Sequence, residues 1–282
     1  FRQFNWGMNM KVNFTCRPDN EAPVVLACPL FESSGLVRHG FSTRLGGVSE
    51  PPFDTLNLGM NTADSLENVR ENYARFCREI GVERDKLILT RQVHSADIRI
   101  VSEQDAGKGF SRASDLGEFD GMITAARRLP IAVFYADCTP ILLLDPVKKV
   151  VAAVHSGWKG TLARIGRKAV QMMRRNFGCE PSDILAAFGP SIKQCHFEVG
   201  GDVFVQFCQS FGARSLSRSI VKGDKFYVDT DWLNMRQLVE EGLKEENISI
   251  CTGCTYCEHE IFYSHRADGG KTGRMCAVIE LL

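Results

Sequence analysis

The sequence predicts a single α/β domain of mixed α+β type, with a central mixed β-sheet covered by helices. Short β-rich apolar runs bounded by turn residues alternate with segments whose apolar residues recur at helical spacing. The 282 residues contain no internal repeat, low-complexity tract or long linker. Strands and helices interleave without a strict βαβ rhythm, and no Walker A loop or G-x-G-x-x-G turn follows a strand. This pattern favours a mixed sheet over a barrel or a doubly wound nucleotide-binding fold.

The elements are expected in the following order. A helix begins at Leu66, where Asp64 can cap its first turn with Glu67 three residues on, and it ends at Gly81. An amphipathic helix follows Gly160, with apolar residues on one face and basic residues elsewhere. The other expected elements are strands at 131–135, 141–144, 150–154, 184–188 and 275–281 and helices at 203–211 and 232–243.

Composition narrows the functional classes. The apolar share of 44% and the charged share of 24% are those of an ordinary globular protein and exclude extensive disorder, collagen-like repeats and coiled-coil rods. Lys+Arg and Asp+Glu both total 34, so no global charge favours nucleic acid or an anionic membrane as a partner. Apolar runs such as 129–135 fall short of the roughly 18 residues of a membrane span. We therefore expect a cytoplasmic protein.

The N-terminus has no secretory signal pattern. Residues 1–10 contain Arg2 but no apolar h-region behind it. Because Phe1 is not a start residue, this stretch could be added or trimmed sequence, with Met8 and Met10 as alternative starts.

The 11 cysteines are odd in number and scattered, which predicts mostly reduced thiols in the core. The exception is the C-x-x-C-x-x-C run of Cys251, Cys254 and Cys257, which could hold zinc or an iron–sulfur cluster. His259 and His265 lie nearby, but a well-spaced fourth cysteine is missing. The incomplete ligand set favours ordinary thiols over a metal at this run.

Three residues at predicted strand ends carry the strongest chemical signal. His94 follows the apolar run 87–89, Cys138 comes at the end of one buried strand, and His155 ends the strand after the next. Two imidazoles and a thiolate are a ligand set that zinc accepts while keeping a fourth position for water or substrate. The same atoms also suit a metal-free thiol hydrolase with Cys138 as nucleophile and either histidine as its base. The residues alone leave these two alternatives open.

Other polar loops surround this set. The segment 39–49 contains Arg44 and a Gly-Gly pair, which suit anion binding, and 57–61 contains Asn57. The segment 119–121 is most simply a turn. The basic, Gly-rich connection 263–274, which contains Arg266, could hold a phosphate or a carboxylate. A solvated turn explains 39–49 and 57–61 as well as a binding role does, and it is the favoured explanation for 263–274.

Several of these motifs occur together and in order, and the chain resembles the YfiH-type purine nucleoside phosphorylase family, also known as the laccase-domain or multicopper polyphenol oxidase family. The resemblance extends over residues 36–281, nearly the whole chain. The motifs that carry it are those at 39–49, 57–59, 92–95, 119–121, 136–140, 155–160, 188–192, 264–269 and 272–274.

The resemblance implies a catalytic domain at 36–282, preceded by an N-terminal extension with the first strands at 1–35. It implies a zinc ion held by His94, Cys138 and His155, with copper as an alternative metal. It also implies phosphorolysis of adenosine, guanosine, inosine or 5′-methylthioadenosine to base and ribose 1-phosphate, and deamination of adenosine.

Residue roles beyond the metal ligands are hypotheses. Arg44 is the first candidate for an anion or substrate contact, and Asn57 and Arg266 are further substrate-binding candidates. Asp137, adjacent to the ligand Cys138, is the candidate acid/base.

Three other functions compete with this interpretation. A copper laccase requires a trinuclear cluster built on many His-x-His ligands, and the six histidines here include no such pair. A thiol-dependent amidase or peptidoglycan-precursor editing enzyme would use Cys138 directly and would survive chelation. A binding module would hold metal without turnover.

Overall fold

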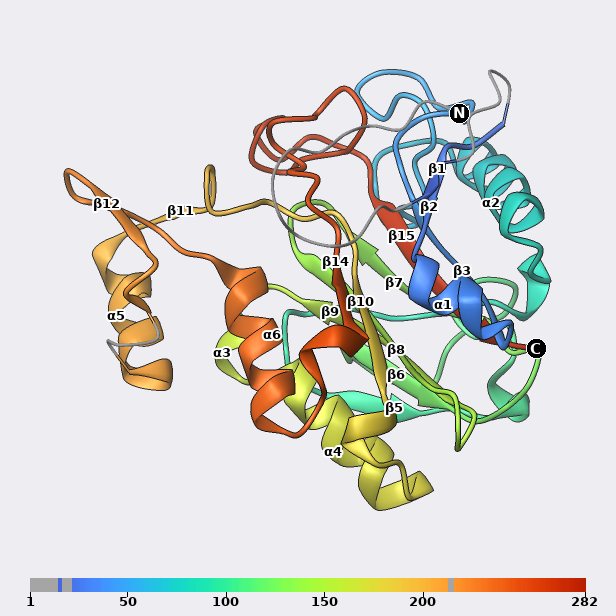
Figure 1. The fold of residues 1–282 in the computed structure, drawn as a ribbon. Helices are drawn as coiled ribbons and strands as arrows, with labels where there is room; N and C mark the ends of the chain where they lie inside the picture. The colour runs from blue at the N-terminus through green and yellow to red at the C-terminus, as the bar shows by residue number, and fades with distance from the viewer. Residues whose placement is uncertain (1–14, 17–21, 213–215) are drawn as a thin grey trace.

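The computed structural model describes residues 15–16, 22–212 and 216–282, so the stretch 1–10 lies outside the described residues. Two six-stranded mixed sheets form the body of the molecule (Figure 1). In spatial order, the first sheet contains β1 (Thr15–Cys16), β2 (Val25–Ala27), β3 (Val37–Ser42), β15 (Met275–Leu281), β7 (Ile131–Tyr135) and β4 (Ile88–Leu89). The second contains β14 (Ile248–Ile250), β10 (Leu185–Phe188), β8 (Thr139–Asp145), β9 (Val150–Ser156), β6 (Gly121–Thr124) and β5 (Ile98–Ile100).

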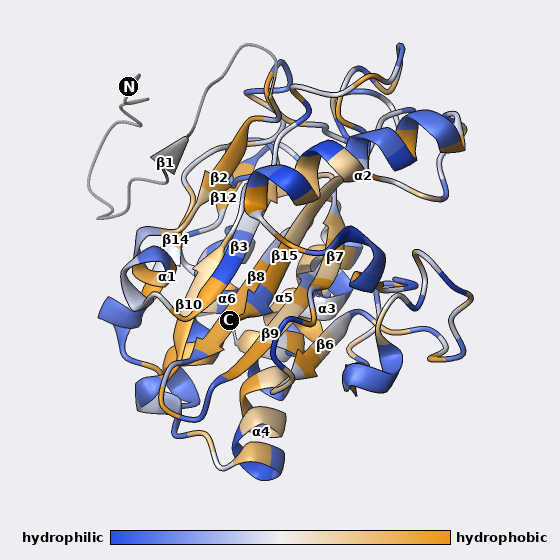
Figure 2. Cartoon of the chain, turned by 90° about the vertical axis from the view of Figure 1, so that its right-hand side faces the viewer, coloured by the Kyte–Doolittle hydropathy of each residue, from blue (hydrophilic) through white to orange (hydrophobic). Residues whose placement is uncertain are grey.

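The two sheets pack against each other through one shared apolar core. Side chains of β7 and β15, such as Val133 and Ala277, share this core with Leu142 and Ala153 of β8 and β9. Because successive side chains point to opposite faces of a strand, the alternate residues of β8, such as Ile141, face the other way, toward helix α4. Strands buried on both faces are continuously apolar, as the orange strands of Figure 2 show.

Helices cover the outer faces of both sheets. Helix α2 (Leu66–Ile80) packs Val69, Tyr73 and Phe76 on the first sheet. Helices α4 (Ile165–Phe177) and α6 (Thr230–Glu240) cover the second. The short elements are α1 (Pro29–Ser34), α3 (Trp158–Leu162) and 3-10 turns at Arg84–Lys86, Glu103–Asp105, Pro181–Asp183 and Glu245–Asn247.

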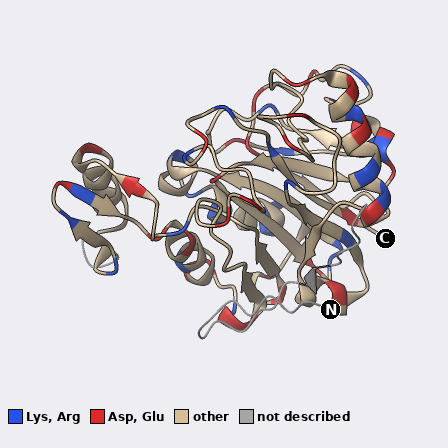
Figure 3. Cartoon of the chain, turned by 90° about the horizontal axis from the view of Figure 1, so that it is seen from above, with Lys and Arg blue, Asp and Glu red and all other residues tan. Residues whose placement is uncertain are grey.

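A small lobe projects from this body, at the left of Figure 1. It consists of α5 (Gly201–Phe211) and a three-stranded sheet of β11 (Glu198–Val199), β13 (Lys225–Tyr227) and β12 (Ile220–Lys222). Its own apolar cluster, which includes Phe207 and Val228, also packs on Trp158 of α3. Basic and acidic residues are interspersed over the lobe and the body (Figure 3).

The mixed α/β class predicted from the sequence is confirmed, and strands 131–135 and 275–281 have the predicted bounds. Other details differ. The central sheet is two stacked sheets, because apolar patterning marks strands but not their partners. The cap of α2 is Ser65, whose hydroxyl accepts the Glu67 N–H. Asp64 instead accepts hydrogen bonds from Ser49 and Asn57.

The helix expected after Gly160 is divided into α3 and α4. Arg164, between them, has a φ of 59°, outside the helical region. Among the described residues, no helix is both long enough and apolar enough to span a membrane.

Candidate functional site

His94, Cys138 and His155 meet at one end of the second sheet. Their ligand atoms all lie within 4.8 Å of one another. The Cys138 Sγ lies 3.9 Å from His94 Nε2, and the two imidazole ring centroids are 4.9 Å apart at an interplanar angle of 78°. The structure thus brings together the three residues that the sequence singled out.

Strand register explains why these residues converge. In the β8–β9 pair, Thr139 lies opposite Ser156 and Pro140 lies opposite His155. Cys138 precedes β8 by one residue, so it comes to the same end of the sheet as His155. His94 lies in the loop between β4 and β5 and adopts a left-handed φ of 60°.

Asp120 organises this loop and one of the ligands. Its carboxylate accepts backbone N–H groups from Val93, His94 and Ser95, at 3.1, 3.0 and 2.8 Å. Its Oδ1 also lies 2.8 Å from His155 Nδ1. A carboxylate bonded to one ring nitrogen of a histidine leaves the other nitrogen free to bind a metal and fixes the ring orientation. The sequence suggested only a turn at 119–121, because a polar residue before a buried strand gives the same local pattern.

Electrostatics favour the charged forms of Asp120, Cys138 and His155. Burial acts to raise the pKa of Asp120, but His155 and the Ser95 N–H outweigh it and lower the pKa. Burial likewise opposes ionisation of Cys138 and His155, yet their mutual attraction lowers the pKa of the thiol and raises that of the imidazole. Cys138 is therefore readily available as a thiolate, the form that binds metal and attacks electrophiles.

The cluster is open on one side. His155 is almost fully buried, Cys138 is half-buried, and His94 is exposed. A zinc ion held by two imidazoles and one thiolate retains a fourth position, and here the exposed His94 side leaves a path to it. The donor set and its accessibility fit a metal that meets a small molecule.

Asp137 is held by its neighbours. It has a left-handed φ of 87°, and its carboxylate oxygens accept the Thr255 hydroxyl at 2.6 Å and the Arg266 backbone N–H at 2.7 Å. The Arg266 guanidinium donates to the Glu198 carbonyl at 3.2 Å. The structure therefore brings the predicted residue Arg266 against Asp137, which directly precedes Cys138 in the sequence.

Arg44 and Asn57 are bound into the surrounding loops. The Arg44 guanidinium donates to the carbonyls of Asp54 and His259, pairs with the Asp54 carboxylate at 3.1 Å and lies 4.7 Å from the Tyr263 ring centroid. A role for Arg44 as an anion contact requires release of the Asp54 pair.

Asn57 is fully buried. Its amide donates to Thr62 and Asp64, and its Oδ1 accepts the backbone N–H of Gly59 and Arg274. Its observed contacts order the loop and Arg274.

Arg274 is a half-buried cation that the sequence did not single out from its Gly-rich loop. Burial lowers its pKa, while the charges of Cys138 and Asp137 act to raise it. Its side chain also donates to the carbonyls of Thr272 and Gly273. Only the fold distinguishes it from Arg266, the other arginine in the loop.

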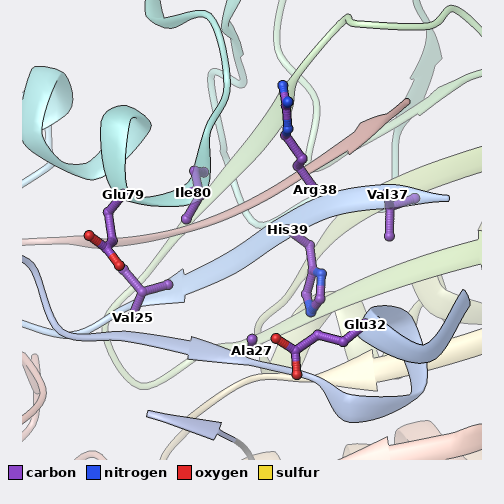
Figure 4. Close-up of a pocket in the computed structure, with 8 residues that line it drawn as sticks. All are labelled: Val25, Ala27, Glu32, Val37, Arg38, His39, Glu79 and Ile80. Atoms are coloured by element: carbon purple, nitrogen blue, oxygen red, sulfur yellow. The ribbon is translucent and has the colours of Figure 1, made fainter. Parts of the chain in front are cut away.

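A hollow lies elsewhere, between β2, β3, α1 and α2 (Figure 4). Its lining includes His39, whose Nε2 accepts the backbone N–H of Cys28 at 2.8 Å. None of its lining residues belongs to the His94 cluster. This hollow is therefore separate from the candidate metal site.

Comparison with known proteins places the chain in a family. Residues 38–282 match the family model described as multi-copper polyphenol oxidoreductase laccase. The chain belongs to this family.

Named members of the family are enzymes. The purine nucleoside phosphorylase YlmD of Bacillus subtilis is 35% identical, over 85% of the chain and 87% of its own length. The adenosine deaminase RL5, from an unknown prokaryotic organism, is 32% identical, over 83% of the chain and 90% of its own. The crystal structure of YlmD from Geobacillus stearothermophilus superposes with a TM-score of 0.86 at 29% identity and covers 95% of this chain and 99% of that one. The family assigned from sequence motifs, and its enzymatic character, are confirmed.

Proposed function

We propose that the chain is a zinc-dependent purine nucleoside enzyme. It would cleave adenosine, guanosine, inosine or 5′-methylthioadenosine with phosphate, and it would deaminate adenosine. The observation that carries the proposal is the accessible cluster of His94, Cys138 and His155 with Asp120 behind it. The names of the relatives supply the substrate class.

The metal would be held by His94 Nε2, Cys138 Sγ and the ring nitrogen of His155 that does not face Asp120. When bound, zinc supplies Lewis-acid polarisation and an activated water at neutral pH. Asp120 keeps the His155 ring in the orientation and tautomer that a ligand requires. It also holds the His94 loop through three backbone hydrogen bonds.

Phosphorolysis requires cations near the phosphate. A phosphate oxygen forms a bond to C1′ while the C1′–N9 bond breaks, and the electron pair leaves with the purine, which takes up a proton. Positive charge grows on the ribose, so positioned donors on the phosphate lower the barrier. We assign the phosphate contact to Arg266, which lies beside Asp137, and to Arg274, whose pKa the charges of Cys138 and Asp137 act to raise. Arg44 would join them only after releasing Asp54.

Deamination of adenosine consumes one water and releases ammonia. A water oxygen bonds to C6, and the amino group leaves after gaining a proton, so an acid/base group must serve both transfers. We assign this role to Asp137. Asp137 would exchange the Thr255 or Arg266 hydrogen bond for one to substrate, and Asn57 would support the site by holding Arg274.

A metal-free thiol enzyme is the second candidate, and one observation favours it. The lowered pKa of Cys138 beside a raised pKa of His155 is also the arrangement of an activated nucleophile and its base. Copper in place of zinc is a variant of the first candidate, since copper accepts the same donors.

The test is chromatographic product analysis with zinc-loaded protein and adenosine, with and without phosphate. Adenine that forms only with phosphate, or inosine that forms without it, is the expected result. Both products should disappear in His94→Ala and after removal of metal by a chelator.

Each alternative gives a different result. Absence of any conversion would overturn the proposal. Activity that survives chelation but is lost on alkylation of Cys138 would favour the thiol enzyme. Oxidation of a phenol by copper-loaded protein, without nucleoside conversion, would favour the laccase.

A further inference from the structure

A second cluster of metal-binding residues lies outside the site described above. Cys195 and His196 come from the loop between β10 and β11, and Cys254 and Cys257 follow β14. The four ligand atoms lie within 4.8 Å of one another. We propose that these four residues bind a second, structural zinc ion.

The distances between the ligand atoms are close to those around a tetrahedrally coordinated zinc ion. Cys195 Sγ lies 3.6 Å from Cys254 Sγ and 3.7 Å from Cys257 Sγ. Zinc bonds thiolates at about 2.3 Å, so tetrahedral angles place two sulfurs about 3.8 Å apart. His196 Nδ1 lies 3.3 Å from Cys195 Sγ and 3.2 Å from Cys257 Sγ, against about 3.6 Å around zinc. A disulfide needs sulfurs about 2.05 Å apart, so this spacing is not that of a bonded pair.

Neighbouring groups hold the ligands in place. The backbone N–H of Lys193 points to Cys254 Sγ at 3.5 Å, a contact that stabilises a thiolate. The His196 ring stacks on Tyr256, with centroids 4.1 Å apart and an interplanar angle of 16°. This stacking fixes the ring with Nδ1 toward the sulfurs.

The donor set also distinguishes this centre from the first one. Three cysteines and one histidine fill all four positions of zinc, which is the composition of a structural site. On binding, the thiols release their protons to solvent, and Cys195 and Cys257 are exposed enough to do so. The His94 cluster has three ligands and keeps one position open.

A metal here would join two segments that position the first centre. In the segment of Cys195, the Ile192 N–H donates to the Asp137 carbonyl at 2.8 Å. In the segment of Cys254, the Thr255 hydroxyl donates to the Asp137 carboxylate at 2.6 Å. Asp137 directly precedes the ligand Cys138. The second metal would therefore help to position Cys138 through these two segments and Asp137.

The spacing of the cysteines alone did not identify this ligand set. The C-x-x-C-x-x-C run contributes Cys254 and Cys257 but not Cys251, and neither His259 nor His265 belongs to the cluster. The completing ligand Cys195 lies 59 residues before Cys254 in the sequence. The pairing of β10 with β14, continued by the bridge between Ser191 and Cys254, brings the two loops together.

The experiment is metal analysis of the purified full chain by mass spectrometry after zinc loading and removal of free metal. Wild type should hold two zinc ions per chain, and Cys195→Ser and Cys257→Ser should each hold one. Cys251→Ala is the matched control from the same cysteine run and should hold two. His94→Ala should also hold one zinc ion, because it loses the zinc of the first centre and keeps that of the second.

Cobalt alone provides a second readout in the Cys138→Ser background, where the first centre has no sulfur ligand. An intense thiolate-to-cobalt charge-transfer band should remain there and disappear when Cys257→Ser is added. Two variants at exposed positions, Cys195 and Cys257, guard against a folding defect in either one, and circular dichroism confirms the fold.

Two results would overturn the proposal. One is a zinc content in Cys195→Ser and Cys257→Ser equal to that of wild type. The other is recovery of Cys195 in a disulfide with Cys254 or Cys257 from unreduced, zinc-loaded protein. Neither result bears on the nucleoside activity proposed for the His94 centre.

Discussion

The two clusters of cysteine and histidine differ in how the chain assembles them. Cys138 and His155 come from two strand ends and His94 from the loop between β4 and β5, whereas Cys195–His196 and Cys254–Cys257 come as two local pairs on neighbouring loops. A carboxylate stands behind the first cluster, and a backbone N–H and an aromatic ring support the second.

The two arrangements suit different roles. Ligands at strand ends are held by a rigid sheet and can leave a position open for chemistry. Paired ligands on loops close around a metal and connect the loops. The first cluster is therefore suited to catalysis and the second to holding the catalytic surroundings in place.

Removal of a metal ligand from the first cluster should reduce nucleoside turnover more than any other change considered below. In His155→Ala, we expect loss of the zinc held there and a fall in nucleoside turnover of about 10³-fold, because several kcal/mol of transition-state stabilisation are lost. Metal content and kcat/KM measure this. His259→Ala, an exposed histidine outside both clusters, is the control and should behave as wild type. Full turnover in His155→Ala would place the chemistry elsewhere.

His39 tests whether a buried histidine near a cysteine is enough for a metal site. Its Nε2 accepts the Cys28 N–H, and burial lowers its pKa from 6.5 to about 4, so it is a neutral acceptor in the core. As pH falls from 7 to 4, the unfolded state gains a proton at this residue before the folded state does. The unfolding free energy should therefore fall by about 3 kcal/mol, with little further loss from this residue below pH 4.

Urea unfolding at several pH values measures this dependence in wild type and His39→Gln, which keeps an acceptor for Cys28. The variant should show a flatter profile and an unchanged zinc content. Identical profiles in the two proteins would show that His39 is not the titrating group.

Asp120→Asn sharpens the contrast between the two clusters. An amide binds the His155 ring more weakly than a carboxylate does, so zinc affinity at the first centre and turnover should each fall by about 10- to 100-fold. The metal at the second cluster should be unaffected. Competition with a zinc chelator measures the affinity, and Asp97→Asn, an exposed carboxylate of the same loop, is the control. Equal losses at both centres would mean that the substitution acts through global unfolding.

The sequence singled out all three residues of the first cluster but favoured ordinary thiols at the cysteine run that contributes to the second, and the cause is physical. Cys138 and His155 adjoin apolar strands whose ends could be located by patterning, so their meeting followed from strand pairing. Asp120 was assigned to a turn, because its hydrogen bonds to His155 and to the His94 loop exist only after folding. Cys195 offered no local signal that would pair it with Cys254.

The same limit applies to the sheets and to the polar residues. Apolar runs located β7, β8, β9 and β15, but alternation could not show that they belong to two stacked sheets. The Arg44 guanidinium is held by Asp54 and by the carbonyl of His259, which is distant in sequence. Residue types thus indicate candidate chemistry, and long-range packing determines which candidates are free to perform it.

Gly157 offers the smallest and most local test of the first cluster. It follows β9 opposite Cys138, and a Cβ at this position would lie 2.9 Å from His94 Cδ2 and 3.1 Å from Cys138 Sγ. Its φ of −75° is open to alanine, so Gly157→Ala changes space rather than backbone conformation. We expect zinc affinity to fall by about tenfold, since both ligands must shift.

Gly166→Ala is the control for Gly157→Ala, because its added methyl would meet only Leu238 and Ile141, at 3.5 and 3.6 Å. Thermal unfolding separates a loss of metal from a loss of fold. If Gly157→Ala binds zinc as wild type does, the His94 loop yields at little cost, and the rigidity that we assign to the strand-end cluster belongs to Cys138 and His155 alone.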